Sequence, residues 1–167
     1  MKLGADDGGF LMNIRSEHGA SAVEFAIVLP LLLVLVFGII EFSIFLFDKA
    51  VITNASREGA RKGVLFYFRD FDGDGENENY PLSDTEIRDI VKAYANSHLI
   101  NLGGGQNDLV DGDIVITPVE PRATDDNLRV DVTFAYDFLV FPDLSQLLGG
   151  NFSDTITLRG VTTMRVE

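Results

Sequence analysis

The chain has 167 residues, enough for a single domain, and its lack of cysteine excludes disulfides, thiolate nucleophiles and zinc–thiolate sites. A formal net charge of −13 argues against nucleic-acid binding. Hydrophobic residues make up 46% of the sequence, and many of them are concentrated in one N-terminal run. We therefore expect one module anchored by that run.

An apolar window covers residues 25–47, and Glu41 is its only charged residue. At 1.5 Å per residue this window is about 34 Å long as a helix, enough to cross a hydrocarbon core of roughly 30 Å. The window predicts one membrane-spanning helix, with a bend at Pro30, which lacks a backbone N–H. A cleavable secretory signal is the alternative, but the run continues into Asp48 without a small-residue cleavage site.

Two carboxylates, Glu24 and Glu41, flank most of this run. A charged residue at the bilayer centre costs about 2.5–3.5 kcal/mol on insertion scales, so each carboxylate is expected near an interface or with a partner. For Glu41 two interpretations stay open, a side chain that snorkels to the interface and a contact with another subunit.

The positions of the basic residues around the window bear on the membrane topology. Upstream lie Lys2 and Arg15, whereas four bases follow the window closely, and the positive-inside rule would place the C-terminal side in the cytoplasm. The four are Lys49, Arg57, Arg61 and Lys62.

Four blocks of sequence, in order, resemble the start of TadE-like proteins. They are Gly-Ala-Ser-Ala-Val-Glu-Phe at 19–25, Val-Leu-Pro-Leu-Leu-Leu at 28–33, Gly-Ile-Ile-Glu at 38–41 and Asn-Ala-Ser-Arg-Glu-Gly-Ala-Arg at 54–61. The segment 155–167 is also similar to the ending of such proteins. TadE-like proteins are pilin-like components of the tight-adherence (Flp) pilus system, so the resemblance implies a pseudopilin.

The resemblance implies cleavage by a membrane prepilin peptidase between Gly19 and Ala20, which makes residues 1–19 a cytoplasmic leader. A glycine before the scissile bond suits this chemistry, because a residue without a side chain lets a protease approach the backbone closely. Glu24 lies one helical turn after the new amine of Ala20, and the resemblance implies that it pairs with the amine of a neighbouring subunit. The implied processing site is Gly19, Ala20, Glu24 and Phe25, and the implied transmembrane and assembly residues are Glu24, Pro30 and Glu41.

The resemblance also implies an inner-membrane protein with its N-terminus in the cytoplasm and its head outside it. This topology opposes the one that the bases favour, and the expectation follows the resemblance. Residues 20–63 are then a transmembrane and stalk helix, and residues 64–167 an extracytoplasmic head.

Acidic residues at alternate positions mark a loop after the stalk. Asp70, Asp72 and Asp74 match ligand positions 1, 3 and 5 of an EF-hand loop, and Glu76 continues the alternation. Position 12, however, is Pro81 rather than a glutamate. Two interpretations stay open, a calcium site formed by Asp70, Asp72, Asp74 and Glu76, and a solvated acidic loop; no cofactor is expected to be required.

The rest of the head alternates helix and strand signals. Ser83 and Glu86 form a predicted capping box before a helix from about 84 to 99, with His98 on its inward stripe. Period-two alternation predicts antiparallel strands at 114–119, 128–140 and 155–166. The expected fold class is α+β: a long N-terminal membrane-spanning helix with a stalk, then a small pilin-like head in which one helix packs on a three-stranded antiparallel sheet.

No catalytic constellation emerges from the sequence. The two histidines are His18, in the leader, and His98, and the carboxylates cluster in turns, so no enzyme is expected. The leading hypothesis is a minor pilin-like subunit whose partners are the lipid bilayer, the prepilin peptidase, other pilin-like subunits and the pilus assembly platform, with no nucleic acid and no small-molecule substrate. The alternative is an uncleaved single-pass binding module, stabilised by calcium.

Overall fold

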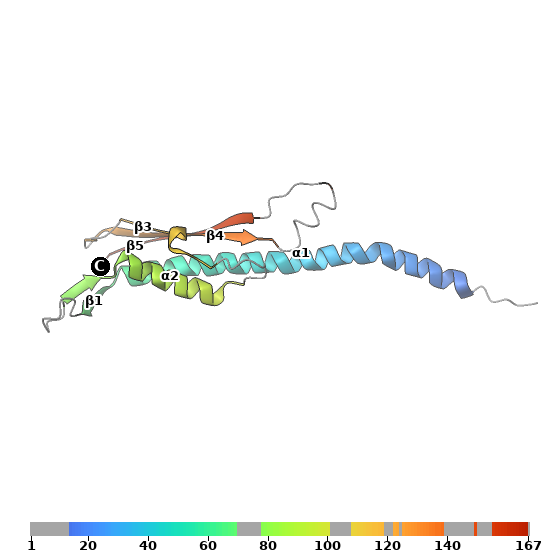
Figure 1. Cartoon of the computed structure of the whole chain (residues 1–167), viewed down its shortest axis with the longest axis horizontal. Helices are drawn as coiled ribbons and strands as arrows, with labels where there is room; N and C mark the ends of the chain where they lie inside the picture. The colour runs from blue at the N-terminus through green and yellow to red at the C-terminus, as the bar shows by residue number, and fades with distance from the viewer. Residues whose placement is uncertain are drawn as a thin grey trace, which may run out of the picture. The chain divides into compact units, whose positions relative to one another are not determined.

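The computed structural model describes residues 14–69, 78–100, 108–118, 122–123, 125–138, 149 and 155–166. The chain divides into two units, Met1–Gly38 and Ile39–Glu167. Figure 1 shows the order of the elements along the chain.

Helix α1 (Ile14–Gly63) belongs to both units and continues through Pro30. No side chain from residue 19 to residue 40 is buried, and Ile27 and Leu31 are each 71% exposed. By length and composition α1 can cross a membrane, and it is the one such helix among the described residues. The predicted N-terminal apolar helix is thereby confirmed, whereas a bend at Pro30 stays a prediction.

The second unit contains a three-stranded antiparallel sheet with the order β3 (Ile114–Thr117), β4 (Asn127–Asp137) and β5 (Thr155–Arg165). The register is fixed by period-two burial: Leu128, Val130, Val132 and Phe134 of β4 are all buried, whereas Arg129 between them is exposed. Val130 pairs with Ile116 on one side and with Thr162 on the other.

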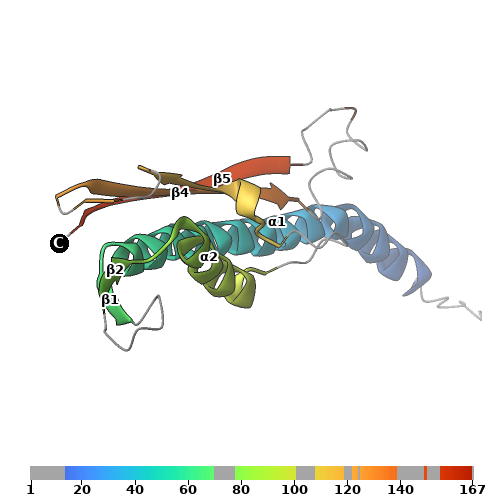
Figure 2. The ribbon, with the colours of Figure 1, turned by 60° about the vertical axis from the view of Figure 1, so that its left-hand side comes forward.

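Helix α2 (Asp84–His98) begins at the predicted capping box. The Glu86 N–H donates to the Ser83 hydroxyl at 3.3 Å, and the Ser83 N–H donates to the Glu86 carboxylate at 2.9 Å. Within the second unit, α2 and the later part of α1 lie on one face of the sheet (Figure 2). The α+β class and the helix on a three-stranded sheet are confirmed.

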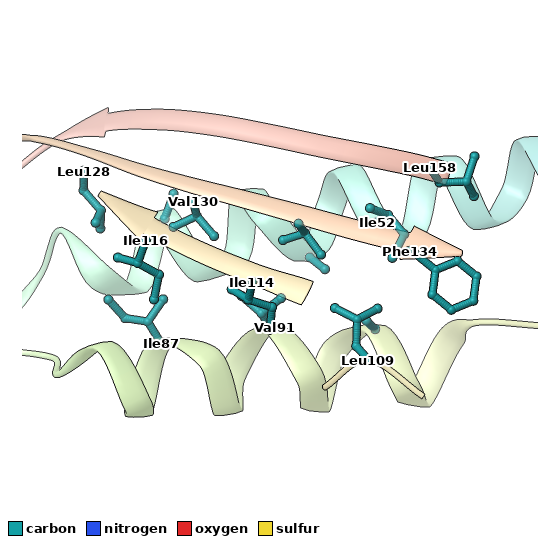
Figure 3. Packing of buried hydrophobic residues seen from close by; sticks show 14 of the residues in the cluster. Ile52, Ile87, Val91, Leu109, Ile114, Ile116, Leu128, Val130, Phe134 and Leu158 are labelled. Atoms are coloured by element: carbon teal, nitrogen blue, oxygen red, sulfur yellow. The ribbon is translucent and has the colours of Figure 1, made fainter. Parts of the chain in front are cut away.

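The core lies between these helices and the sheet (Figure 3). Ile52 of α1, Ile87 and Val91 of α2 and Leu128 of β4 are each 0% exposed. Burying such a side chain stabilises the fold by about 1.5–3 kcal/mol relative to leaving it in water, so this contact holds α1 to the head.

Two features of the head differ from the prediction. A two-stranded antiparallel hairpin, β1 (Phe66–Arg69) and β2 (Glu78–Pro81), precedes α2 and was not predicted. The prediction that His98 is buried was wrong. His98 is exposed, and its ring stacks on Tyr94 with centroids 4.7 Å apart. It is the last residue of α2, and the buried stripe of the helix ends earlier, at Ala95. A short 3₁₀ turn at Asp111–Asp113 leads into β3.

Candidate functional site

The processing junction predicted from the sequence lies inside α1. Gly19, Ala20, Glu24 and Phe25 are all helical and all exposed, Phe25 at 61%. A protease needs extended backbone at the bond it cuts, so cleavage here would require this turn of helix to unwind. Glycine lowers that cost, because it is about 0.8–1.0 kcal/mol less favourable than alanine in a helix interior.

No packing contact explains the glycine at position 19. A Cβ added to Gly19 would meet nothing within 4 Å, whereas one added to Gly63 would lie 2.6 Å from Ile87 Cδ1 and from Leu128 Cδ2. Gly63 is therefore needed for packing and Gly19 is not. Since Gly19 weakens the helix without improving a contact, its reason must lie outside the packing of the described chain.

Glu24 is exposed on α1 within the first unit, four residues after Ala20. Residues four apart on a helix lie on the same face, about 5–6 Å apart between Cβ atoms. The geometry therefore places the carboxylate one turn from the backbone nitrogen of Ala20. The pairing of this carboxylate with the amine of a neighbouring subunit stays a prediction.

Glu41 is covered by its own chain, and a contact with another subunit stays a prediction. It is 3% exposed, and it lies beneath the head of its own chain, where the Tyr136 hydroxyl donates to its backbone carbonyl at 3.4 Å. Asp48, two turns further along the same face of α1, is 0% exposed. Its Oδ1 atom accepts a hydrogen bond from the Ile100 N–H at 3.0 Å, so this acid fixes the chain just beyond α2.

An aromatic group covers this stretch of α1. Phe45 meets Tyr136 edge-on with centroids 5.5 Å apart and stacks with Phe138 at 6.2 Å. Burial raises the pKa of Tyr136 to about 12, and the negative charges of Glu41 and Asp48 add to the effect. The tyrosine is thus held neutral, as expected for a hydroxyl that is both desolvated and close to acids.

The block 54–61, which resembles TadE-like proteins, is the surface of α1 on which the head packs. Its small residues Ala55, Ser56 and Ala60 are 0% exposed, and Gly59 is buried against Val91 of α2. The Ser56 hydroxyl lies 2.8 Å from the Thr162 hydroxyl of β5. Small side chains let two backbones approach closely, so this block has a packing role in addition to any role in assembly.

The proposed calcium ligands Asp70, Asp72, Asp74 and Glu76 lie outside the described residues. Within the described ranges, no group of three or more His, Cys, Asp or Glu side chains is gathered in a way that could hold a metal ion. Calcium binding by the loop therefore stays a prediction.

On the face of α1 that packs against the head, the sequence analysis missed two residues, Asp48 and Ser56. A signal was available for both. Asp48 follows Glu41 by seven residues, which places two acids on one helix face, and Ser56 falls in a run of small residues at helical spacing. The sequence shows the helical spacing of these residues, but it does not show that the head covers them.

Comparison with known proteins supports the resemblance. The family model described as TadE-like protein matches residues 19–61. The chain has no significant match among the curated proteins or among the solved structures. The match begins at Gly19 and ends at Arg61, so it takes in the junction, the exposed apolar part of α1 and the small residues under the head. Residues 19–61 are therefore similar to the TadE-like family, and the rest of the chain lies outside the match.

Proposed function

We propose that the chain is a minor pilin-like subunit of a tight-adherence (Flp) pilus assembly system. In this proposal a membrane prepilin peptidase cleaves between Gly19 and Ala20, the exposed apolar part of α1 holds the mature subunit in the inner membrane, and the head lies outside the cytoplasm. Other pilin-like subunits and the pilus assembly platform are its partners. Its work is assembly rather than catalysis.

The observation that carries the proposal is the start of the family match at Gly19, a glycine with no packing contact. An exposed apolar helix follows it directly, and Glu24 lies one turn after the bond that would be cut. A protease site, a charge near the new amine and a membrane anchor thus follow one another within about one bilayer thickness of helix.

Intact mass of the membrane-extracted protein tests the cleavage. We expect a mass that lacks residues 1–19 when a prepilin peptidase is co-expressed, and the full mass without the peptidase. Gly19→Phe should retain the leader in both cases, because a bulky side chain blocks the approach to the backbone. A full-length mass for the unmodified chain beside an active peptidase would instead favour an uncleaved single-pass binding module.

Glu24→Ala separates processing from assembly. The variant should still lose residues 1–19, yet its recovery in pilus or assembly-platform fractions should fall, because the neighbouring amine has lost its carboxylate. Glu24→Gln tests whether the charge itself is needed. Equal recovery of all three proteins would contradict the role proposed for Glu24.

A reporter fused after the head tests the topology, on which the bases and the resemblance disagree. A reporter that is active only outside the cytoplasm should be active in this fusion, and a reporter that is active only in the cytoplasm should be silent. The reverse pattern would contradict a pilin-like subunit.

A further inference from the structure

The outer face of the sheet, opposite α1 and α2, has no covering layer among the described residues. Val115 of β3 and Val161 of β5 are 57% and 42% exposed, and both pair with Asp131 in one row across the three strands. The outward positions of β4 and β5 also carry Arg129 and Arg159. We call Val115, Arg129, Asp131, Arg159 and Val161 the outer sheet patch.

Asp131 holds the two arginines of this patch in place. Arg159 Nε donates to Asp131 Oδ1 at 2.8 Å and its Nη2 contacts Oδ2, while Arg129 Nη2 donates to Oδ2 at 3.0 Å. Asp131 itself is 8% exposed, whereas the side chains of Arg129 and Arg159 are 47% and 56% exposed. The surface therefore presents guanidinium groups and covers the acid.

These guanidinium groups are prepared to bind another anion. The hydrogen bond from Arg159 holds the pKa of Asp131 below its usual range, and Arg129 contributes in the same direction, so the acid stays charged at neutral pH. The remaining N–H groups of Arg129 and Arg159 have no acceptor in the described part of the chain. Side chains already fixed by one carboxylate lose little entropy on binding a second.

The chain supplies a matching anion in its own sequence. Asp70, Asp72, Asp74, Glu76 and Glu78 alternate with uncharged residues, in a protein whose net charge is −13. Glu78, the last of them, is the first residue of β2. In an extended chain alternate side chains point the same way about 6.6 Å apart, so an extended segment of this sequence would present a row of carboxylates.

We propose that the outer sheet patch binds the acidic segment 70–78 of a second copy of this chain. The contact joins two different surfaces, so a pair of copies would leave one patch and one acidic segment unoccupied. Such a heterologous contact can continue from copy to copy, and it gives a ring or an open helical array. The inference goes beyond the proposed function, because it depends neither on cleavage nor on the pilus system.

Cross-linking between two single-cysteine chains tests the contact, and the absence of native cysteine makes the labels clean. Thr163→Cys places a label on β5 beside Arg129, its cross-strand partner, and Asn77→Cys places one in the acidic segment. Both full-length chains are reconstituted together in lipid vesicles with a chelator present and treated with a short bis-maleimide. We expect mixed dimers from this pair, and few from Thr163→Cys mixed with Asp89→Cys on α2.

Charge reversal gives the decisive result. Arg129→Glu with Arg159→Glu in the Thr163→Cys chain should lower the yield about tenfold, the change that a loss of about 1.4 kcal/mol brings. Arg57→Glu with Arg61→Glu, the same change of charge on the exposed side of α1, should leave the yield unchanged. Asp72→Lys with Asp74→Lys on the partner chain should restore cross-linking to the reversed patch.

A second variant guards against damage to the head, because reversal places two acids beside Asp131. Asp70→Asn with Asp72→Asn and Asp74→Asn in the Asn77→Cys chain leaves the patch intact and should also lower the yield. Unchanged yield in either set, or preferential cross-linking to Asp89→Cys, would overturn the proposal. Repeating the assay with Gly19→Phe, which retains the leader, should give the same result, so a failure of processing and a failure of this contact are distinguishable.

Discussion

Helix α1 contains two stretches with opposite surroundings. Between Gly19 and Ile40 no side chain is buried, and Ile27 is 71% exposed; further along, Ile52 is 0% exposed. From Phe25 to Ile40 the first stretch has no charged residue, as expected of a helix that faces lipid. The second buries a stripe of small and branched residues against a head. Composition thus identifies the lipid-facing stretch, and only spacing identifies the protein-facing one.

The largest effect should come from the same substitution made in each stretch. Ile52→Ala leaves a cavity in the core and should lower the free energy of unfolding of the head by about 2–5 kcal/mol. Ile27 is 71% exposed, so Ile27→Ala should leave that free energy unchanged. Denaturant unfolding of the detergent-solubilised chain, followed by near-ultraviolet circular dichroism of the tyrosines, measures both. Equal losses would show that the first stretch also packs on the head.

Replacing a glycine by alanine in each region extends the comparison of the covered and exposed parts of the molecule. A Cβ on Gly160 of β5 would lie 2.6 Å from the Ile52 carbonyl oxygen and 3.0 Å from Thr53 Cα, and these backbone atoms cannot move aside easily. Gly160→Ala should therefore cost the head about 1–3 kcal/mol. Gly19→Ala, with nothing within 4 Å, should not lower the unfolding midpoint. A tolerated Gly160→Ala would mean that β5 can shift away from α1.

Serines provide a smaller effect along the same helix. Ser56→Ala removes the 2.8 Å hydrogen bond to Thr162 and should cost about 1 kcal/mol. Ser43, which donates to the Ile39 carbonyl of its own helix and is exposed, is the matched control. A double-mutant cycle of Ser56→Ala with Thr162→Val isolates the pair. A coupling energy near zero would show that the two hydroxyls do not depend on each other.

The last comparison concerns alkaline pH. Because the folded-state pKa of Tyr136 is about 12 and the ordinary value is 10.0, the unfolded chain releases this proton first as pH rises. The contribution of Tyr136 is full below pH 10 and is lost between about pH 10 and 12. Tyr136→Phe should flatten the fall in stability across that window. Stability curves of equal slope for Tyr136→Phe and the unmodified chain would contradict the shift.

Sequence patterns predicted those parts of the fold that depend on local periodicity. Alternation placed Leu128, Val130 and Val132 on one face of β4, and the Ser83–Glu86 pair placed the start of α2. The hairpin β1–β2 was missed because each strand has four residues, too few for period two to be distinct. His98 was placed wrongly because helical spacing continues past the point at which the sheet stops covering the helix.

The residues of the candidate site also fall into two groups, those that local sequence patterns predict and those that depend on long-range contacts. Gly19 and Glu24 were predicted from a local sequence block; the structure places both on exposed turns of α1, and their roles stay predictions. The environment of Glu41 was not found, since it depends on Tyr136, 95 residues away. Asp48 likewise depends on Ile100, 52 residues further on. A partner that is distant in sequence does not change the local sequence pattern around the residue that it covers.

The contact between β5 and α1 has a consequence for the order of events during synthesis. Ser56 and Thr162 are 106 residues apart, and β5 follows every other described element in sequence. Chains emerge from the ribosome N-terminus first, so the membrane helix is made long before the strand that packs on it. Until β5 arrives, Ile52 and Ser56 lack their neighbour on that strand. The contact between β5 and α1 can therefore form only as one of the last steps of folding, when the apolar part of the helix has already been made.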